Sequence, residues 1–233
     1  MTARHDACVL AGGLARRLGG RDKPALHVSG RPLVESVAAA VPGAGRLVVV
    51  GPPRPGLPRA IFRREDPPGG GPVPALRAGL AEVTAPWVVL LAADLPFLTA
   101  EHVSALLDAA GAGPGTAPYA EGTRVGAVLV DDAGREQWLA GAWHTASLVR
   151  ALARYEGRSL HGLLAPLAPV TLRLAGQPWF DCDTMDDLQR ARARAEEARD
   201  GRYRGEGARV ERADGVDRAG LPGTGHRSRD GRP

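Results

Sequence analysis

The chain has 233 residues, of which 44% are hydrophobic and 24% charged, a composition sufficient for one α/β domain with a buried core. It contains no apolar run of about 18 residues, which excludes a transmembrane helix. The formal net charge is +4, but residues 202–233 alone carry eight arginines against five acidic residues. The rest of the chain is therefore nearly neutral, and we expect neither a nucleic acid nor a membrane as a partner.

Cysteine usage and the first residues bear on the compartment. Cys8 and Cys182 stand far apart and match no metal-binding or redox spacing. Arg4, His5 and Asp6 lead directly into a short apolar segment, without the long apolar stretch of a signal peptide. We therefore expect a cytoplasmic protein.

Short apolar strands alternate with amphipathic helices over the first hundred residues. The strand patterns cover residues 7–12, 46–51, 60–66 and 87–96. The helix patterns cover residues 31–43, 72–83 and 99–111. This alternation predicts an α/β fold of three α/β/α layers, Rossmann-like, with a mostly parallel sheet.

The second half of the chain is less regular. Residues 124–143 read as two strands around a turn at residues 132–134, and residues 168–175 read as a further strand. The helix patterns here cover residues 144–157, 159–167 and 183–199. The last 33 residues have few large apolar side chains. We therefore expect a domain over residues 1–200 and a disordered, Arg- and Gly-rich tail over residues 201–233.

The loop after the first strand combines glycines with cations. Gly12 and Gly13 allow the backbone to approach a ligand closely, and Arg16, Arg17 and Lys23 follow within a few residues. Neither of the two common phosphate-loop motifs is present, so a glycine-rich turn with solvated charges is the alternative.

Lys23 is the only lysine in a chain with 29 arginines. A compact ammonium suits a confined phosphate site in a way that the planar guanidinium fork does not. Its retention in an arginine-rich chain favours a polyphosphate ligand for the loop.

Residues 10–13, residues 17–19 and Lys23, separated by three residues each time, resemble the motif of the GT-A-type nucleotidyltransferases. This version most resembles the molybdenum cofactor guanylyltransferase family, in which the lysine contacts phosphate. The related cytidylyltransferases tend to have alanine where this chain has Gly12. The resemblance implies that GTP binds to Leu10, Ala11, Gly12, Gly13, Arg17 and Lys23.

Residues 69–80 resemble the segment of this family that precedes a helix near the base. The match is partial, because residues 73–75 read Val-Pro-Ala where Leu-Ala-Gly is usual. Just upstream, the resemblance implies an acidic residue that contacts the nucleotide. Asp66 is the preferred candidate and Glu65 the alternative. For residues 69–80 as a whole, the alternative interpretation is a proline-rich connection that caps a helix.

Asp94 ends the most apolar strand pattern of the chain, where it meets a proline-containing turn. A carboxylate at the carboxyl end of a strand is well placed to bind Mg²⁺, which prefers oxygen ligands. The alternative is an aspartate that caps the following turn. In the family that the sequence resembles, this aspartate holds the metal.

Residues 180–188 resemble a family segment that reads Asn-x-Asn-Thr-Pro-Glu-Asp-Leu. Here Asp181 and Asp183 replace both asparagines, and Met185 replaces the proline. We hypothesise that Asp183 is a second Mg²⁺ ligand, with Asp181 as the alternative. The competing interpretation is that Asp183 is the N-cap of the last helix.

Residues 134–143 resemble the part of the family that faces the acceptor substrate. Trp138, Trp143, His144 and Arg158 are candidates to contact the acceptor, while packing in the core is the alternative for each tryptophan. His27, His102 and His161 match no metal spacing.

The resemblance implies an Mg²⁺-dependent enzyme that transfers GMP from GTP to Mo-molybdopterin and releases pyrophosphate. Lys23, Arg17 and Asp94 would be its catalytic residues, and other proteins of molybdenum cofactor biosynthesis are expected partners. Two alternatives stay open: a cytidylyl- or sugar-nucleotidyltransferase of the same fold, and a nucleotide-binding regulatory protein that has lost catalysis.

Overall fold

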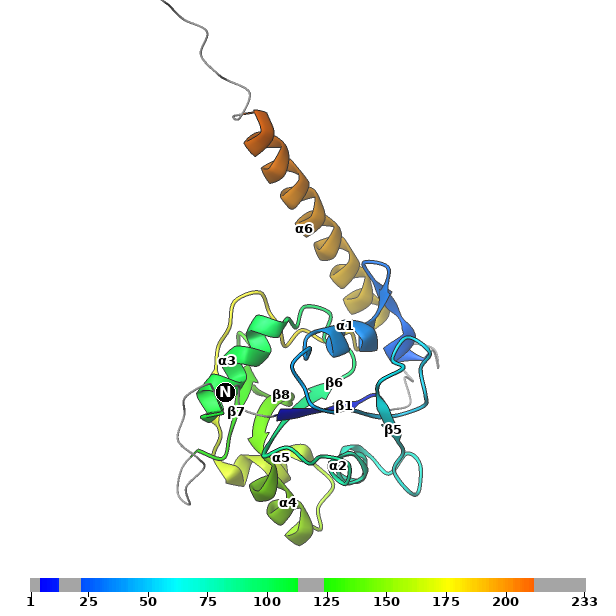
Figure 1. Cartoon of the computed structure of the whole chain (residues 1–233), viewed down its shortest axis with the longest axis vertical. Coiled ribbons are helices and arrows are strands. Elements are labelled where there is room, and N and C mark those ends of the chain that lie inside the picture. The colour runs from blue at the N-terminus through cyan, green and yellow to red at the C-terminus, as the bar shows by residue number, and fades with distance from the viewer. Residues whose placement is uncertain (1–4, 13–21, 113–123, 212–233) are drawn as a thin grey trace, which may run out of the picture. The chain divides into compact units, whose positions relative to one another are not determined.

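The computed structural model describes residues 5–12, 22–112 and 124–211, with side chains through residue 200. Its centre is a seven-stranded sheet in the order β5-β4-β1-β6-β8-β7-β9 (Figure 1). The strands are β1 (His5–Leu10), β4 (Leu47–Val50), β5 (Ile61–Arg63), β6 (Trp87–Ala92), β7 (Gly126–Val130), β8 (Glu136–His144) and β9 (Val170–Leu172). Only β8 runs against the others, so the sheet is mostly parallel, as predicted.

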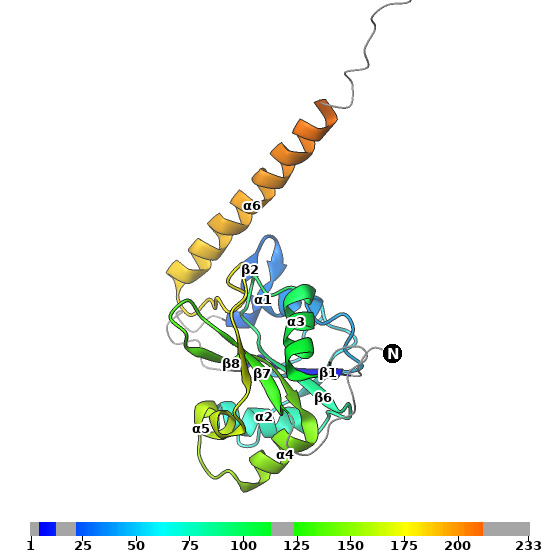
Figure 2. The same cartoon turned by 90° about the vertical axis from the view of Figure 1, so that its left-hand side faces the viewer.

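Helices cover both faces of this sheet (Figures 1 and 2). One face carries α1 (Leu33–Ala39) and α3 (Ala100–Ala110). The other carries α2 (Pro72–Leu80), α4 (Thr145–Arg154) and α5 (Leu160–Leu164). The three α/β/α layers confirm the predicted fold class.

The two hydrophobic cores follow from the alternation of side chains along the central strands. On β1, Val9 packs on the side of α1 and α3, whereas Cys8 and Leu10 pack on the side of α2. The α2 side is tightly filled: a Cβ added to Gly79 would lie 2.5 Å from Sγ of Cys8. A strand buried on both faces needs a continuous apolar run, which is why this pattern was readable in the sequence.

Asp6 is a buried carboxylate at the start of β1. It accepts hydrogen bonds from the backbone N–H groups of Arg46, Thr84 and Ala85 at 2.8–2.9 Å. These bonds tie the loops before β4 and β6 to the first strand. The sequence pattern gave no indication of this role.

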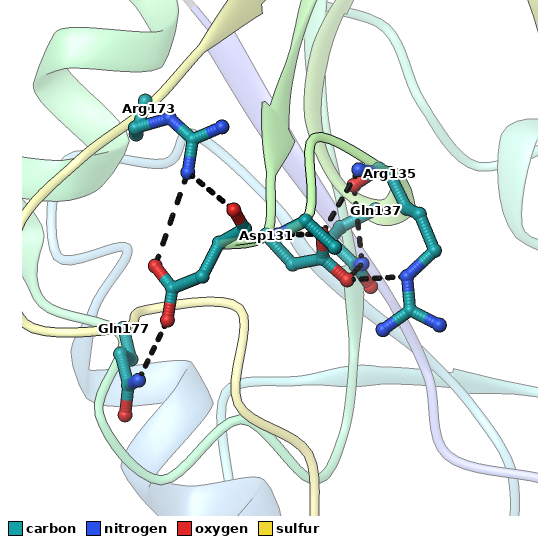
Figure 3. A network of polar contacts seen from close by, with 7 residues as sticks. Asp131, Arg135, Gln137, Arg173 and Gln177 are labelled. Carbon is teal, nitrogen blue, oxygen red and sulfur yellow. Dashed lines mark hydrogen bonds and ion pairs between the residues drawn. The ribbon is translucent and has the colours of Figure 1, made fainter.

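Asp131 closes the hairpin between β7 and β8 (Figure 3). Its Oδ1 accepts from the backbone N–H groups of Ala133 and Arg135, both at 2.9 Å, and its Oδ2 from Nε of Arg135 at 2.7 Å. Gly134 has a φ of +80°, a conformation that favours glycine. The predicted turn at residues 132–134 is confirmed.

Several elements differ from the sequence-based expectations. A small hairpin of β2 (His27–Val28) and β3 (Arg31–Pro32) precedes α1 and was not predicted. It takes the first residues of the expected helix, so that Pro32 is the N-cap rather than part of the first turn. Two 3₁₀ turns, η2 (Lys23–Ala25) and η3 (Ala165–Leu167), were also not foreseen.

The last helix, α6, spans Met185–Glu211. The chain divides into two compact units, Met1–Ala193 and Arg194–Pro233. The domain boundary at residue 200 and the disorder of the tail stay predictions, and residues 212–233 lie outside the described part. Among the helices that the structure describes, none is long and apolar enough to cross a membrane.

Candidate active site

A cavity of about 990 Å³ lies at the carboxyl ends of β1 and β6. Ala11 and Gly12, which follow β1, and Asp94, which follows β6, contribute to its wall. In open α/β sheets this edge is where ligands bind, because the connections diverge there. The predicted site residues Leu10, Ala11, Gly12, Lys23 and Asp94 all line this one cavity.

Lys23 joins three distant parts of the chain. Its Nζ lies 2.5 Å from Oδ1 of Asp183 and also forms an ion pair with Asp94. Burial, the largest single influence, lowers the pKa of Lys23, but the two carboxylates more than offset it and hold the pKa above its ordinary value. The lysine is therefore charged at neutral pH.

Three carboxylates converge on this ammonium group. Asp94, Asp181 and Asp183 each offer an oxygen within 4.8 Å of the others. Asp94 is buried, whereas Asp181 and Asp183 are exposed toward the cavity that they line. Burial raises the pKa of Asp181 to about 6, and the neighbouring charges of Asp183 and Asp94 add to this effect against the opposing effect of Lys23.

The donor set of this cluster fits a hard divalent cation. All three ligand atoms are carboxylate oxygens, and no other group of three or more such ligands occurs among the residues the structure describes. Mg²⁺ and Mn²⁺ take carboxylates plus waters and substrate phosphates, which an open cavity permits. Asp181, the alternative ligand, lies in the cluster together with Asp183.

The start of α6 separates the two interpretations of Asp183. The helix begins at Met185, and Thr184 takes the capping position. The backbone N–H of Asp187 donates to Oγ1 of Thr184 at 3.1 Å, while the backbone N–H of Thr184 donates to the carboxylate of Asp187 at 2.8 Å. This reciprocal capping box satisfies the helix end, so Asp183 is left to contact Lys23 instead.

The acidic residue upstream of α2 is placed differently from the preferred prediction. Glu65 lines the cavity and accepts a hydrogen bond from the backbone N–H of Gly69 at 2.9 Å. Asp66 is not among the lining residues. The structure thus brings the alternative, Glu65, to the site, because residues 64–71 form an irregular connection whose direction a sequence pattern does not specify.

The opposite wall of the cavity comes from β8 and α5. Trp138 lines it and meets the ring of His161 edge to face, with centroids 5.6 Å apart. Trp143 is fully buried in the core, and neither His144 nor Arg158 is among the lining residues. Of the four candidates for acceptor contact, the structure brings only Trp138 to the cavity.

Some residues of the cavity were not predicted from the sequence, and some predicted residues lie outside the described part of the chain. His161, Ser159 and Trp179 line the cavity but carried no motif, since their place depends on how α5 and the last loop pack. Gly13 and Arg17, predicted to bind GTP, lie outside the described part of the chain.

Fold and site together define an α/β domain with a cation-and-carboxylate cavity at the carboxyl edge of a mostly parallel sheet. Residues 7–171 match the MobA-like NTP transferase domain family, and the chain belongs to this family of nucleotidyltransferases. The predicted family relationship is thereby confirmed.

Curated relatives agree with this membership. The molybdenum cofactor guanylyltransferase of Rhodobacter capsulatus is 30% identical over 200 residues, which cover 82% of this chain and 96% of that protein. A probable molybdenum cofactor guanylyltransferase of Trichormus variabilis is 39% identical over 103 residues, 41% of this chain and 48% of that protein.

Solved structures share the fold. One is the molybdopterin-guanine dinucleotide biosynthesis protein A of Archaeoglobus fulgidus, with a TM-score of 0.62 and 21% identity over 82% of this chain and 99% of that one. Another is the 2-C-methyl-D-erythritol 4-phosphate cytidylyltransferase of Thermus thermophilus, with a TM-score of 0.60 and 21% identity over 83% and 99%. Because relatives with different names fit about equally well, this likeness establishes the fold and not the nucleotide.

Proposed function

We propose that the protein transfers GMP from GTP to Mo-molybdopterin, forming the guanine dinucleotide form of the cofactor and releasing pyrophosphate. The observation that carries the proposal is the convergence of Lys23 with Asp94, Asp181 and Asp183 in one cavity at the sheet edge. The choice of guanine and of the acceptor rests on the names of curated relatives, the first of which aligns over nearly its whole length.

The proposed reaction needs no nucleophile from the protein. An oxygen of the acceptor's terminal phosphate forms a bond to the α-phosphorus of GTP, and the bond from that phosphorus to the α,β-bridging oxygen breaks. The electron pair stays with the leaving pyrophosphate. Catalysis then consists of alignment and of neutralising charge on the phosphate oxygens.

Lys23 supports this step as a mobile cation. Its ammonium lies in the cavity beside the carboxylates, and its flexible stem allows it to reach the β- and γ-phosphates of a bound nucleotide. Arg17 is proposed to share this role. The backbone at Ala11 and Gly12 forms the adjoining wall, where a triphosphate can approach without a side chain at residue 12.

Asp94, Asp181 and Asp183 would hold Mg²⁺ in this cavity. When bound, the ion would neutralise phosphate charge and orient the reacting oxygens. The convergence of the three side chains supports this role, and Lys23 contacts two of them, Asp94 and Asp183.

The acceptor is proposed to lie against β8 and α5, on the wall formed by Trp138 and His161. A planar heterocycle such as a pterin matches such an aromatic surface. The cavity of about 990 Å³ has room for more than one substrate. A cytoplasmic location and association with other proteins of the same pathway are proposed from family membership alone.

Pyrophosphate release with each of GTP, CTP, ATP and UTP, with and without Mo-molybdopterin, tests the proposal. We expect release with GTP that depends on the acceptor and on added Mg²⁺. Release with CTP instead would favour a cytidylyltransferase. Nucleotide binding without release from any substrate pair would favour a regulatory protein that has lost catalysis.

A further inference from the structure

Arg54 forms a two-pronged ion pair with Asp22, at the entrance to the turn that carries Lys23. Its Nη1 lies 2.5 Å from one carboxylate oxygen of Asp22 and its Nη2 lies 2.7 Å from the other. The Arg54 side chain is only 11% exposed, although Asp22 is 53% exposed. Paired contacts of this kind fix orientation as well as distance, which a single ammonium contact does not.

The carboxylate partner is the immediate chain neighbour of Lys23. The carbonyl of Asp22 accepts from the backbone N–H of Ala25 at 3.0 Å, and the carbonyl of Lys23 accepts from the N–H of Leu26 at 3.1 Å. The side chain of Asp22 thus fixes the first residue of the 3₁₀ turn whose first helical position is Lys23. A lysine stem is flexible, so the place of its ammonium depends on where its backbone is held.

The arginine side of the pair is anchored to the sheet. Gly51 directly follows β4, and its N–H donates to the carbonyl of Arg63 at 2.8 Å. A Cβ at Gly51 would lie 2.9 Å from the carbonyl oxygen of Ala11, so this backbone lies directly against the cavity wall. Arg54 therefore reaches Asp22 from a segment that is held against the strand ends around the site.

We infer that Arg54 and Asp22 are positioning residues, which hold Lys23 where its ammonium meets the phosphates of the substrate. Neither residue is among those that line the cavity, so they act through Lys23 rather than on the ligand. This inference rests on the proposed function for the role of Lys23, and it goes beyond it by assigning a function to two residues outside the site.

Opposite charge changes separate positioning from simple electrostatics. Arg54→Ala removes a positive charge, whereas Asp22→Asn removes a negative one. If these residues only contributed to the field around an anionic ligand, the first change would weaken binding and the second would strengthen it. A positioning role requires both to weaken it.

The test measures the affinity of the full chain for inorganic triphosphate in the presence of Mg²⁺ by calorimetry, with thermal unfolding of each variant in parallel. We expect Arg54→Ala and Asp22→Asn each to raise Kd by about tenfold, within the range of coupling between contacting groups. Arg54→Lys keeps the charge but not the two-pronged geometry, and we expect an intermediate Kd. In a protein that already carries Lys23→Met, Arg54→Ala should raise Kd by less than about twofold, because the residue through which Arg54 acts is gone.

Arg63→Ala is the matched control. It removes another guanidinium–carboxylate pair, Arg63 with Glu82 at 2.8 Å, and should leave Kd unchanged. The inference is overturned if Asp22→Asn binds triphosphate as tightly as the wild type or more tightly. It is overturned equally if Arg54→Ala has its full effect without Lys23, or if the wild type does not bind triphosphate. Binding of triphosphate without turnover of GTP would reject the proposed function alone.

Discussion

The ammonium of Lys23 lies 2.5 Å from Oδ1 of Asp183, at the point where Asp94 and Asp181 also converge. The lysine ammonium thus lies within the carboxylate cluster that is proposed to hold a divalent cation. A metal held as proposed would compete with the lysine for Asp94 and Asp183, the two carboxylates that the lysine contacts. The flexible stem of Lys23 would let its ammonium reach the phosphates of a bound nucleotide, while Asp94 and Asp183 would be left to hold the cation.

We predict that Lys23→Met binds Mn²⁺ more tightly than the wild type. Without the ammonium, the added cation is what relieves the repulsion among the three carboxylates. We expect the affinity for Mn²⁺ to increase about tenfold, which corresponds to an ordinary coupling energy between contacting groups. Titration of the nucleotide-free protein with Mn²⁺, followed by electron paramagnetic resonance, measures this. Lys23→Arg, which keeps a positive charge, is the control, and unchanged or weaker binding in Lys23→Met would contradict the competition.

We predict opposite outcomes for Thr184 and Asp183. Thr184→Ala removes the N-cap of α6 and should lower the free energy of unfolding by about 1 kcal/mol, while Mn²⁺ affinity is retained. Asp183→Ala should weaken Mn²⁺ binding with little change in unfolding. Urea denaturation and metal titration of both variants check this. Loss of stability in Asp183→Ala alone would indicate that Asp183, and not Thr184, caps α6.

We predict that alanine has different consequences at two glycines. At Gly12 the nearest atom to an added Cβ, among the residues that the structure describes, is the carbonyl oxygen of Val50 at 3.8 Å, so this part of the fold tolerates the methyl group. Because Gly12 lines the cavity, Gly12→Ala should weaken GTP binding without changing thermal stability. Gly79→Ala would instead force a methyl group against Cys8, and overpacking of this kind costs about 1–3 kcal/mol. Unchanged affinity of Gly12→Ala for GTP, measured by calorimetry beside thermal unfolding of both variants, would contradict a close approach of the ligand at Gly12.

Asp131 gives a prediction for pH dependence (Figure 3). Hydrogen bonds from the backbone N–H of Arg135, together with its side chain, hold the pKa of Asp131 below the ordinary value of 3.8 against the effect of burial. A lowered pKa means that the charged form stabilises the fold. This stabilisation is complete above pH 3.8 and is lost as the pH falls through the pKa of the folded state.

Asp131→Asn should therefore have a lower free energy of unfolding than the wild type at neutral pH. The difference in the free energy of unfolding should shrink toward zero at strongly acidic pH. Urea denaturation at both conditions measures it. A difference that is independent of pH would show that the carboxylate charge is not what stabilises this hairpin.

The sequence predicted the fold well where one local pattern decides the structure. The apolar runs of β1 and β6 indicate strands buried on both faces, and Asp94 follows directly from the end of such a strand. Lys23 stood out because the chain otherwise uses arginine. These features need no knowledge of distant contacts.

The remainder of the site depends on contacts between distant segments. The pairing of Lys23 with Asp183 joins residues 160 positions apart. Glu65 rather than Asp66 lines the cavity because of the path of an irregular loop. Trp143 and Trp138 pack in the same hydrophobic cluster, yet Trp143 is fully buried where β8 pairs with Gly126 of β7, whereas Trp138 lies near the start of β8 and lines the cavity. Such distinctions follow from tertiary packing and not from residue type.

Lys23→Ala tests the central claim most directly. Pyrophosphate release from GTP, with Mo-molybdopterin as acceptor and Mg²⁺ present, is measured for the wild type and for this variant, with thermal unfolding as a control for folding. Loss of one electrostatic donor to the reacting phosphates predicts a rate lower by about 10²–10³-fold in a folded protein. An unchanged rate in Lys23→Ala would contradict the assignment of this cavity as the site of nucleotidyl transfer.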